Sequence, residues 1–193
     1  MIVAGIDYSI SSPSLCIWDT ETDFTHKNFK FFVLEKSTTK KEQKRRETLS
    51  EEWKNNISIK NKCLILKENI PEYIVMADYF VSILSEYGVK KVFMESYAYA
   101  GKGKVFNLAE ATGLLKTFIC LSGIKIKLYE PLHVKKIFTG NGRASKERMI
   151  DSYNEKFSLD IRKIYGINMS DSPLSDIVDS AAMIYTALQM EDI

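Results

Sequence analysis

Two acidic residues of this chain stand where carboxylates could do chemistry. Asp7 and Glu95 each end an apolar run, at residues 2–6 and 92–94, that is typical of a buried strand. A carboxylate in such surroundings is costly unless it is hydrogen-bonded, paired or bound to a cation. If the two strands are neighbours in one sheet, the carboxylates can converge on a single cation. The alternative for each residue is a strand-end acid that is solvated or bonded to the backbone.

Asp176 and Asp179 are three residues apart, so on a helix they share a face. They lie roughly opposite an apolar stripe, which favours a solvated acidic face; the stripe contains Leu174, Ile177, Val178, Ala181, Tyr185 and Leu188. The acidic side carries no lysine or arginine, and its other members are Ser180, Ala182, Met183 and Thr186. Such side chains would let this helix approach the sheet, or a substrate, closely.

Together, four carboxylates are the kind of ligand set that hard cations prefer. Oxygen ligands select Mg²⁺ or Mn²⁺ over softer metals. Two such cations about 4 Å apart can activate a water and stabilise the leaving oxygen in phosphodiester hydrolysis. Metal-dependent hydrolysis is therefore one hypothesis, and a set of ordinary strand-end and surface acids is the other.

The elements that must position these acids follow from the apolar periodicity. Strands at residues 1–9, 14–19 and 28–35 are close in sequence and predict an antiparallel meander. The order then becomes helix, strand, helix, strand, helices, which indicates a mixed sheet flanked by helices. We expect one α/β domain over residues 1–193.

The later elements have recognisable ends. Ser145 is a typical N-cap for a helix over 146–157. Pro71 suits the start of a helix that stops near Gly88. The other expected elements are strands at 90–95 and 124–129, helices at 108–121 and 131–139, and a last helix from about Pro173 after an N-capping Ser172.

Residues 36–68 are polar and charged, without a clear strand pattern. We expect a basic helical insertion or a mobile arm there. Its first part, residues 36–46, has six basic residues against the single acid Glu42. Such a run is either a solvated surface or an arm that contacts phosphates, and the sequence leaves both open.

The composition excludes several classes of protein. Net charge is +2 and 45% of residues are hydrophobic, as in an ordinary globular domain. No apolar stretch could cross a membrane, and no secretory signal opens the chain. The cysteines, Cys16, Cys63 and Cys120, stand far apart and are expected to be free thiols. We therefore expect an intracellular, cytoplasmic protein without a membrane partner.

Residues 129–147, YEPLHVKKIFTGNGRASKE, resemble the corresponding stretch of RuvC-type Holliday junction resolvases, which belong to the ribonuclease H-like superfamily. That family carries a Y-x-P-x-x-V-K-x-x-x-T-G-x-G-x-A-x-K-E pattern between its second and third acidic positions. Three further pieces occur in the order that the family requires: GIDYSISSPSLCIW, VFMESYAYAGKGKVFNLAEATGLL and SDIVDSAAMIYTAL. The match is that of a divergent member, from a bacterium or a virus-infected cell.

The resemblance implies a fold, an activity and a set of site residues. The fold would be a ribonuclease H-like mixed sheet, with three antiparallel strands followed by parallel strands. The activity would be a Mg²⁺-dependent endodeoxyribonuclease, with Mn²⁺ able to substitute. The positions that match the family's metal-binding and catalytic acids are Asp7, Glu95, Asp176 and Asp179. Those that match lysines near the scissile phosphate are Lys146, also expected to be catalytic, and Lys135 or Lys136.

DNA contacts are expected in two segments. After Glu95, aromatic and basic residues alternate on a glycine-rich stretch that corresponds to the family's junction-probing loop: Tyr97, Tyr99, Lys102, Lys104 and Phe106. Aromatic rings can stack on unpaired bases while lysines meet phosphates; a packed tyrosine pair with solvated lysines is the alternative. Arg143 and Lys146 lie at an expected helix N-terminus, which favours anions.

The partner implied by the resemblance is branched double-stranded DNA, above all four-way junctions, bound by a homodimer. Three other functions are open. They are a broader nuclease for forks and flaps, a binding protein for branched nucleic acid that no longer cuts, and an actin-like or sugar-kinase ATPase suggested by the opening GIDYS. Four clustered carboxylates would repel phosphates in a purely binding protein, and one domain leaves no room for the second lobe of such an ATPase.

Overall fold

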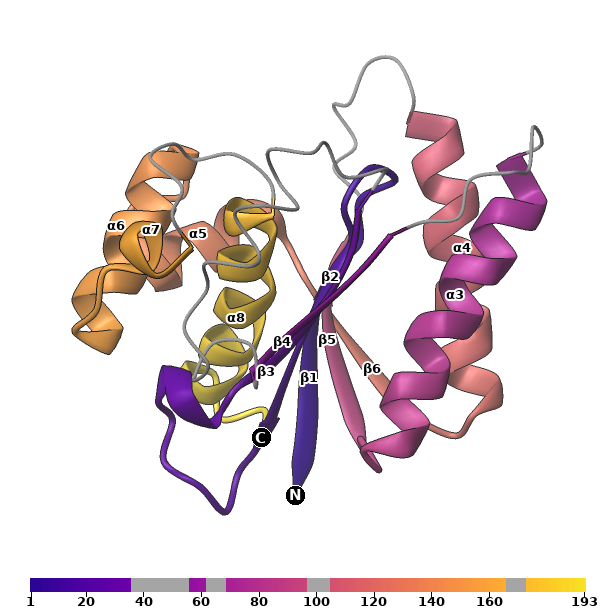
Figure 1. Cartoon of the computed structure of the whole chain (residues 1–193), viewed down its shortest axis with the longest axis horizontal. Coiled ribbons are helices and arrows are strands. Elements are labelled where there is room, and N and C mark those ends of the chain that lie inside the picture. Colours follow the sequence, from indigo (N-terminus) through magenta and orange to yellow (C-terminus); the bar gives the residue numbers. More distant parts are fainter. Residues whose placement is uncertain (36–55, 62–68, 97–104, 166–172) are drawn as a thin grey trace.

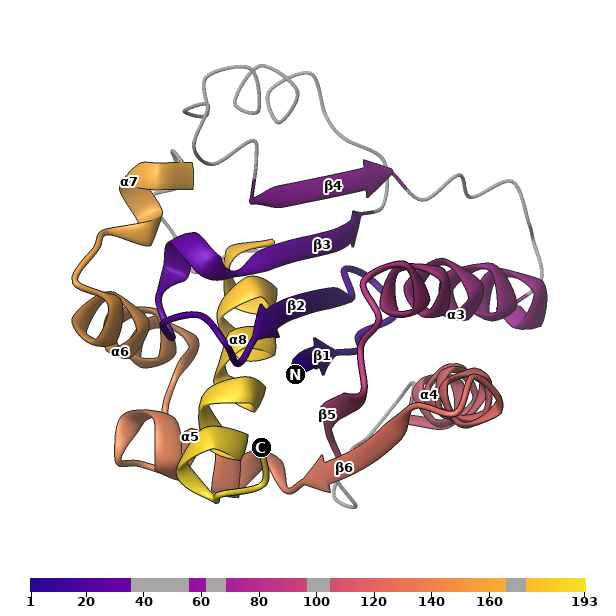
Figure 2. The same cartoon turned by 90° about the horizontal axis from the view of Figure 1, so that it is seen from below.

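The computed structural model describes residues 1–35, 56–61, 69–96, 105–165 and 173–193. Within these ranges the strands form one six-stranded sheet, in the order β4-β3-β2-β1-β5-β6 (Figure 2). The strands are β1 (Ile2–Asp7), β2 (Ser14–Asp19), β3 (Lys30–Glu35), β4 (Ile57–Asn61), β5 (Lys91–Glu95) and β6 (Lys125–Tyr129). The expected mixed sheet is confirmed, because β1, β2 and β3 are antiparallel neighbours while β5 and β6 run parallel to β1.

Strand β4 corrects one expectation. Residues 57–61 were expected to lie in a helical insertion, but they form a strand that pairs in parallel with β3. The segment reads Ile-Ser-Ile-Lys-Asn, which is a short apolar–polar alternation, and the edge of β3 satisfies its backbone. The rest of the expected insertion, residues 36–55 and 62–68, lies outside the described residues.

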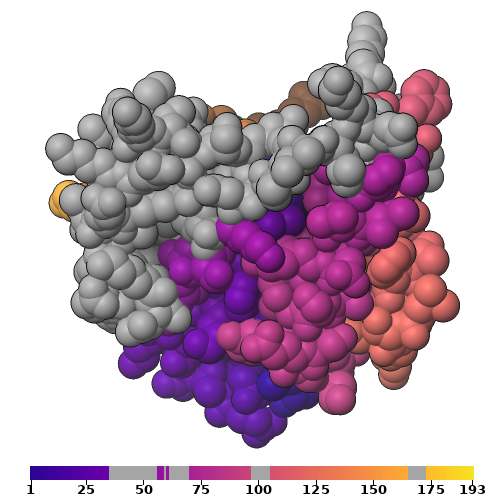
Figure 3. Space-filling view, turned by 45° about the vertical axis from the view of Figure 1, so that its right-hand side comes forward, coloured from indigo at the N-terminus to yellow at the C-terminus, as the bar shows by residue number. Residues whose placement is uncertain are grey.

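Helices cover both faces of the sheet (Figure 1). On one face, α3 (Asn69–Glu86) and α4 (Val105–Leu121) pack side by side; Figure 3 shows α3 at the surface of this side, with α4 next to it. On the other face, α8 (Leu174–Gln189) lies against β1, β2 and β5. Outside it lie α5 (Pro131–Thr139), α6 (Lys146–Phe157) and α7 (Ile161–Tyr165), and a 3-10 turn, η1 (His26–Asn28), precedes β3. None of the described helices is long and apolar enough to span a bilayer.

The alternation along each strand divides the core into two parts. Ala4 and Ile6 of β1 face α3 and α4, where they meet residues such as Phe80 and Leu115. Val3 belongs to the opposite cluster, under α8. Since successive side chains of a strand point to opposite faces, residues 3, 5 and 7 face α8. The strand therefore directs the carboxylate of its last residue toward that helix.

Gly5 allows α8 to lie close to β1. A Cβ at this position would be 2.1 Å from the carbonyl oxygen of Ser180 and 2.9 Å from Cβ of Met183. Any other residue would force the helix away from the strand, so glycine is required by the contact and not by the backbone conformation. The interpretation that small side chains let this helix approach the sheet is confirmed.

The prediction of a solvated acidic face on α8 is wrong. Asp176 is only 6% exposed and Ser180 is fully buried. The helix lies between the sheet and α5, α6 and α7, so it is covered on both sides. Periodicity identified the apolar stripe correctly but contained no information about what covers the opposite side.

Most helix ends agree with the sequence. Helices α5 and α6 have the expected bounds, and the Ser145 hydroxyl accepts a hydrogen bond from the Arg148 amide at 3.2 Å. Helix α8 has Pro173 at its N-cap, and Ser172 lies outside the described residues. Both described cysteines, Cys16 and Cys120, are free thiols, as expected.

Candidate active site

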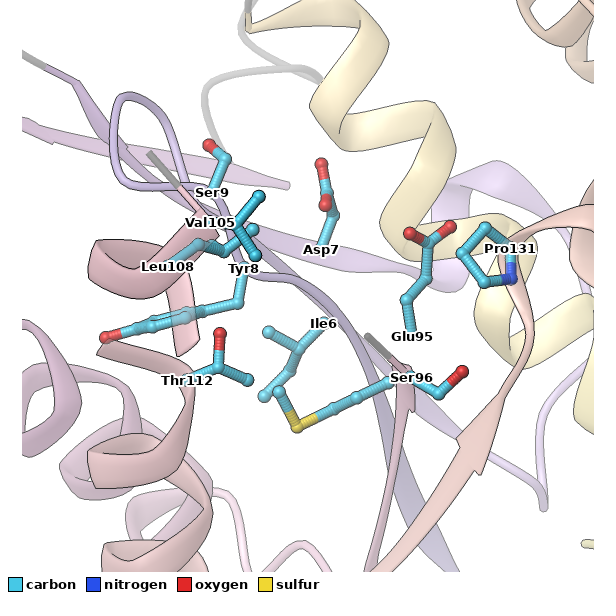
Figure 4. A pocket seen from close by; sticks show the side chains of 11 residues that line it. Ile6, Asp7, Tyr8, Ser9, Glu95, Ser96, Val105, Leu108, Thr112 and Pro131 are labelled. Carbon is cyan, nitrogen blue, oxygen red and sulfur yellow. The ribbon is translucent and has the colours of Figure 1, made fainter. Parts of the chain in front are cut away.

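Asp7 and Glu95 end neighbouring parallel strands. The β1–β5 register aligns Ile6 with Met94, so the next residue of each strand brings the two carboxylates side by side. Both side chains are partly buried. Figure 4 shows both carboxylates directed to the same side, toward α8. The predicted convergence of two strand-end acids therefore exists in the structure.

Asp176 and Asp179 approach this point from the first turns of α8. Burial, followed by the negative charges of Asp179, Asp176 and Glu95, raises the pKa of Asp7 well above its ordinary value, while Lys146 lowers it. Neighbouring charges shift a pKa in this way mainly when they lie within roughly 4–6 Å. The four acids thus share one site, although they come from β1, β5 and α8.

The same interactions act on Asp179. Burial, then the charges of Glu95 and Asp176, raises the pKa of Asp179 to about 7, against the opposing effect of Lys135 and Lys146. Burial also raises the pKa of Glu95, and Lys135 lowers it. Without a cation the cluster therefore holds its negative charges at a cost in free energy.

Two serines hold Asp176 in place. The Ser12 hydroxyl donates a 2.8 Å hydrogen bond to Oδ2 of Asp176, and the Ser14 hydroxyl donates to the backbone carbonyl of the same residue. Sequence reasoning assigned the Ser11–Pro13 segment to a turn and missed this role. The partners are 164 residues apart in sequence, so no local pattern could have identified them.

The predicted lysines lie around the acids. Lys146, in the first turn of α6, is exposed and donates to the Ser175 hydroxyl at 3.3 Å, next to Asp176. Lys135 is partly buried, and its Nζ donates to the Ala144 carbonyl at 3.3 Å. Its charge lowers the pKa of Glu95 and of Asp179, whereas Lys136 is exposed. Between the two lysines that the sequence left open, Lys135 is the one whose charge reaches the carboxylates.

The remaining DNA-contact predictions fall in different places. Arg143 is exposed in the loop before α6. Gly142 of the same loop packs tightly, because a Cβ at this position would lie 2.9 Å from the carbonyl oxygen of Leu132. Phe106, in the first turn of α4, is 82% exposed. The other predicted loop residues, Tyr97, Tyr99, Lys102 and Lys104, lie outside the described residues.

The donor set fits a hard divalent cation by its chemistry. All four acids offer only oxygen ligands, and their mutual repulsion is the cost that a bound cation offsets. Among the residues that the structure describes, no three Asp, Glu, His or Cys side chains stand in a geometry that would hold a metal ion as they are. The fit to a divalent cation therefore rests on the chemistry of the four carboxylates and not on a preformed coordination geometry.

Known proteins of one family resemble this chain. The model of the family described as "Crossover junction endodeoxyribonuclease RuvC" matches residues 55–172. The protein of that name from Sulfurovum sp. (strain NBC37-1) is 32% identical over 132 residues, which are 68% of this chain and 76% of that protein. The one from Helicobacter pylori (strain G27) is 32% identical over 125 residues, which are 64% of this chain and 72% of that protein. The match to the protein from a Nitratiruptor species, at 34% identity over 108 residues, covers 55% of this chain and 63% of that protein's length.

Solved structures show the same fold. RuvC of Thermus thermophilus superposes with a TM-score of 0.57 and 18% identity, over 99% of this chain and 97% of that chain. T. thermophilus RuvC in complex with Holliday junction substrate gives a TM-score of 0.61 and 17% identity, over 99% and 94%. The ribonuclease H-like fold expected from the resemblance is thereby confirmed. The family model covers Glu95 and Lys146 but ends before α8 and begins after Asp7, so the four-acid site rests on the geometry described above.

Proposed function

The chain belongs to the RuvC family of crossover junction endodeoxyribonucleases, and we propose that it resolves four-way DNA junctions by metal-dependent hydrolysis of phosphodiester bonds. One observation carries the assignment of the active site. Within one partly buried site, the charges of Asp179, Asp176 and Glu95 add to burial in raising the pKa of Asp7, and those of Glu95 and Asp176 do the same for Asp179. Such a cluster is costly to maintain and useful only with a cation.

The residues that would hold the cation are these four acids. Their all-oxygen chemistry favours Mg²⁺, with Mn²⁺ as a substitute. A bound divalent cation supplies Lewis-acid stabilisation of the charge that develops on the phosphate and on the leaving oxygen. Ser12 and Ser14 fix the side chain and the backbone of Asp176, so that one ligand is oriented before any cation arrives.

Lysines of α5 and α6 are placed to bind the phosphate group of the bond that is cut. Lys146 lies one hydrogen bond from Ser175 and interacts electrostatically with Asp7 and Asp179, so its ammonium group can hold a non-bridging oxygen beside the carboxylates. The N-terminus of α6 adds amide donors of the kind that favour anions. Lys135, Lys136 and Arg143 extend the same positive surface toward the DNA backbone.

The proposal includes further DNA contacts in the segment that follows Glu95. Tyr97, Tyr99, Lys102 and Lys104, together with the exposed Phe106, would probe the unpaired bases at the branch point. Symmetric cutting of two opposing strands needs two active sites, which a two-fold homodimer provides.

The test is a cleavage assay on end-labelled synthetic DNA. Four-way junction, replication fork, flap and linear duplex are each incubated with Mg²⁺, Mn²⁺ or EDTA. We expect paired nicks at symmetric positions of the junction in either metal, and intact duplex. Equal cutting of forks and flaps would replace junction resolution with a broader debranching activity. A junction that is bound but never cut would make this a binding protein.

A further inference from the structure

The side chain of Lys146 is hydrogen-bonded to the helix that carries two of the four acids. Helix α6 lies outside α8 (Figure 1), and Nζ of Lys146 donates a 3.3 Å hydrogen bond to the hydroxyl of Ser175. Ser175 is 2% exposed and immediately precedes Asp176 in the first turn of α8. The acceptor is therefore a fixed point next to the acids, although the lysine that uses it is exposed.

Carboxylates near Lys146 would attract its ammonium group more strongly than a neutral hydroxyl does. Burial raises the pKa of Asp7 and of Asp179, and the charge of Lys146 opposes that rise, so this charge acts on both carboxylates. Among the residues that the structure describes, however, no ion pair joins Lys146 to an acid. A direct ion pair would compensate negative charge that otherwise attracts a divalent cation. The hydrogen bond to Ser175 instead holds the ammonium group beside the acid cluster.

A fixed position for Lys146 matters because a free lysine side chain is flexible. Such a side chain loses much rotamer freedom when it is held in one place. If Ser175 holds Lys146 before the DNA arrives, this loss no longer opposes correct placement of the phosphate. The acceptor and two of the acids belong to one helix, whose position against β1 depends on the close contact at Gly5. The fold, and not the DNA, therefore sets where the ammonium group lies relative to the acids.

We propose that Ser175 is a positioning residue, whose hydroxyl holds the Lys146 ammonium group where it meets a non-bridging oxygen of the phosphate that is cut. The inference rests on the proposed function, since this phosphate reacts only if the chain is a nuclease. Ser175 acts through Lys146 alone. Loss of its hydroxyl therefore slows the reaction more than it weakens DNA binding, because the other phosphate contacts remain.

The same two helices share a second hydrogen bond of this kind, which provides a matched control. Nζ of Lys156 in α6 donates to the Tyr185 hydroxyl of α8 at 3.1 Å. Both partners lie ten residues further along their helices than Lys146 and Ser175, or about 15 Å at the rise of an α-helix. Tyr185→Phe and Ser175→Ala each remove one lysine–hydroxyl hydrogen bond between α6 and α8. A purely structural role for Ser175 predicts that the two variants behave alike.

The first measurement is the single-turnover rate of junction cleavage at saturating protein and Mg²⁺. Ser175→Ala should lower this rate about tenfold, as for loss of one hydrogen bond to a charged group. In the Lys146→Met background it should have no further effect, because the residue on which it acts is gone. Tyr185→Phe should cut at the unmodified rate. Equal rates for the two hydroxyl variants, or additive losses in the double variant, would overturn the proposal. A slow Ser175→Ala variant that also unfolds at a much lower urea concentration than Tyr185→Phe would make the role of Ser175 structural.

A second readout is independent of cutting. In Ca²⁺, with and without the four-way junction, lysines are labelled with a trace of an acylating reagent, and the label on Lys146 is quantified by mass spectrometry. We expect the junction to protect Lys146, Ser175→Ala to lose most of this protection, and Tyr185→Phe to keep it.

The two readouts separate the positioning role from the nuclease activity. Normal cutting and normal protection in Ser175→Ala would overturn the positioning role alone. Protection that depends on Ser175, without cutting by any variant, would support the contact with phosphate and overturn the nuclease. Absence of both cutting and protection in the unmodified protein would overturn both.

Discussion

The hydroxyl of Ser12 donates a 2.8 Å hydrogen bond to Oδ2 of Asp176 and so ties the β1–β2 turn to the first turn of α8. Both residues are buried, at 7% and 6% exposed. One carboxylate of the site is therefore oriented by a neutral partner that has no chemistry of its own. Such outer partners tune how well a ligand set binds its cation.

Ser12→Ala should weaken cation binding and leave the fold intact. We expect the Mg²⁺ concentration for half-maximal cleavage to rise about tenfold or more, as is usual when a metal ligand loses the hydrogen-bond partner that orients it. Ser12→Thr keeps a hydroxyl and should restore most of the loss. The measurement is the cleavage rate against Mg²⁺ concentration. An unchanged half-maximal concentration would mean that the hydrogen bond is only structural.

Asp7→Asn and Asp179→Asn should abolish cutting while junction binding persists. Each variant removes a charge from the cation site, but the phosphate contacts of Lys135, Lys136 and Lys146 remain. Cleavage and gel-shift assays on the same four-way junction separate the two effects, with Asp78→Asn, an exposed acid of α3, as the matched control. Parallel loss of binding and cutting would point to misfolding.

Divalent cations should stabilise the folded chain. The buried acids repel one another, so a bound cation lowers the free energy of the native state by roughly 1–3 kcal/mol at concentrations well above its dissociation constant. Without metal, Asp179→Asn should melt at a higher temperature than the unmodified protein, because one repulsive charge is gone. The same variant should gain less from added Mg²⁺. Thermal unfolding with Mg²⁺ and with EDTA checks both statements.

Gly5→Ala should be strongly destabilising. The added Cβ meets the backbone oxygen of Ser180 at 2.1 Å, so α8 must move and take Asp176 and Asp179 with it. We expect a loss on the order of 3 kcal/mol in the free energy of unfolding, and loss of cutting. Gly113→Ala in α4 is the matched control: no atom lies within 4 Å of its Cβ, and a gain of about 0.5–1 kcal/mol is expected. Urea unfolding of both variants measures the difference.

Acid should destabilise the protein through His26. Burial lowers the pKa of His26 to about 3, and its ring is hydrogen-bonded to the Tyr153 hydroxyl. The unfolded chain takes up this proton below about pH 6.5 while the folded chain does not, so stability falls as pH decreases from 6.5 toward 3. Between pH 7 and pH 5 the contribution is about 2 kcal/mol. His26→Phe should lose that part of the pH dependence in urea titrations, and an unaltered difference between the two pH values would refute the assignment.

The sequence by itself determined the local features of this protein. Strand alternation and turn residues predicted the antiparallel meander, and helix α6 has the predicted N-cap at Ser145. Asp7 and Glu95 could be paired only on the condition that their strands are neighbours, which the parallel β1–β5 pairing fulfils. Strand alternation, turn residues and helix caps each involve only a few consecutive residues, so they can be recognised in a single sequence.

Tertiary structure alone decided how these pieces meet. Helix α8 was expected to be half solvated, but it is enclosed because Gly5 admits it to β1 and α5, α6 and α7 cover its other side. Strand β4 forms because the backbone groups at the edge of β3 are available to pair with it. The Ser12–Asp176 and Lys146–Ser175 hydrogen bonds join residues that are far apart in sequence. Periodicity reports which residues are apolar, whereas burial and orientation depend on which distant segments fill the remaining space.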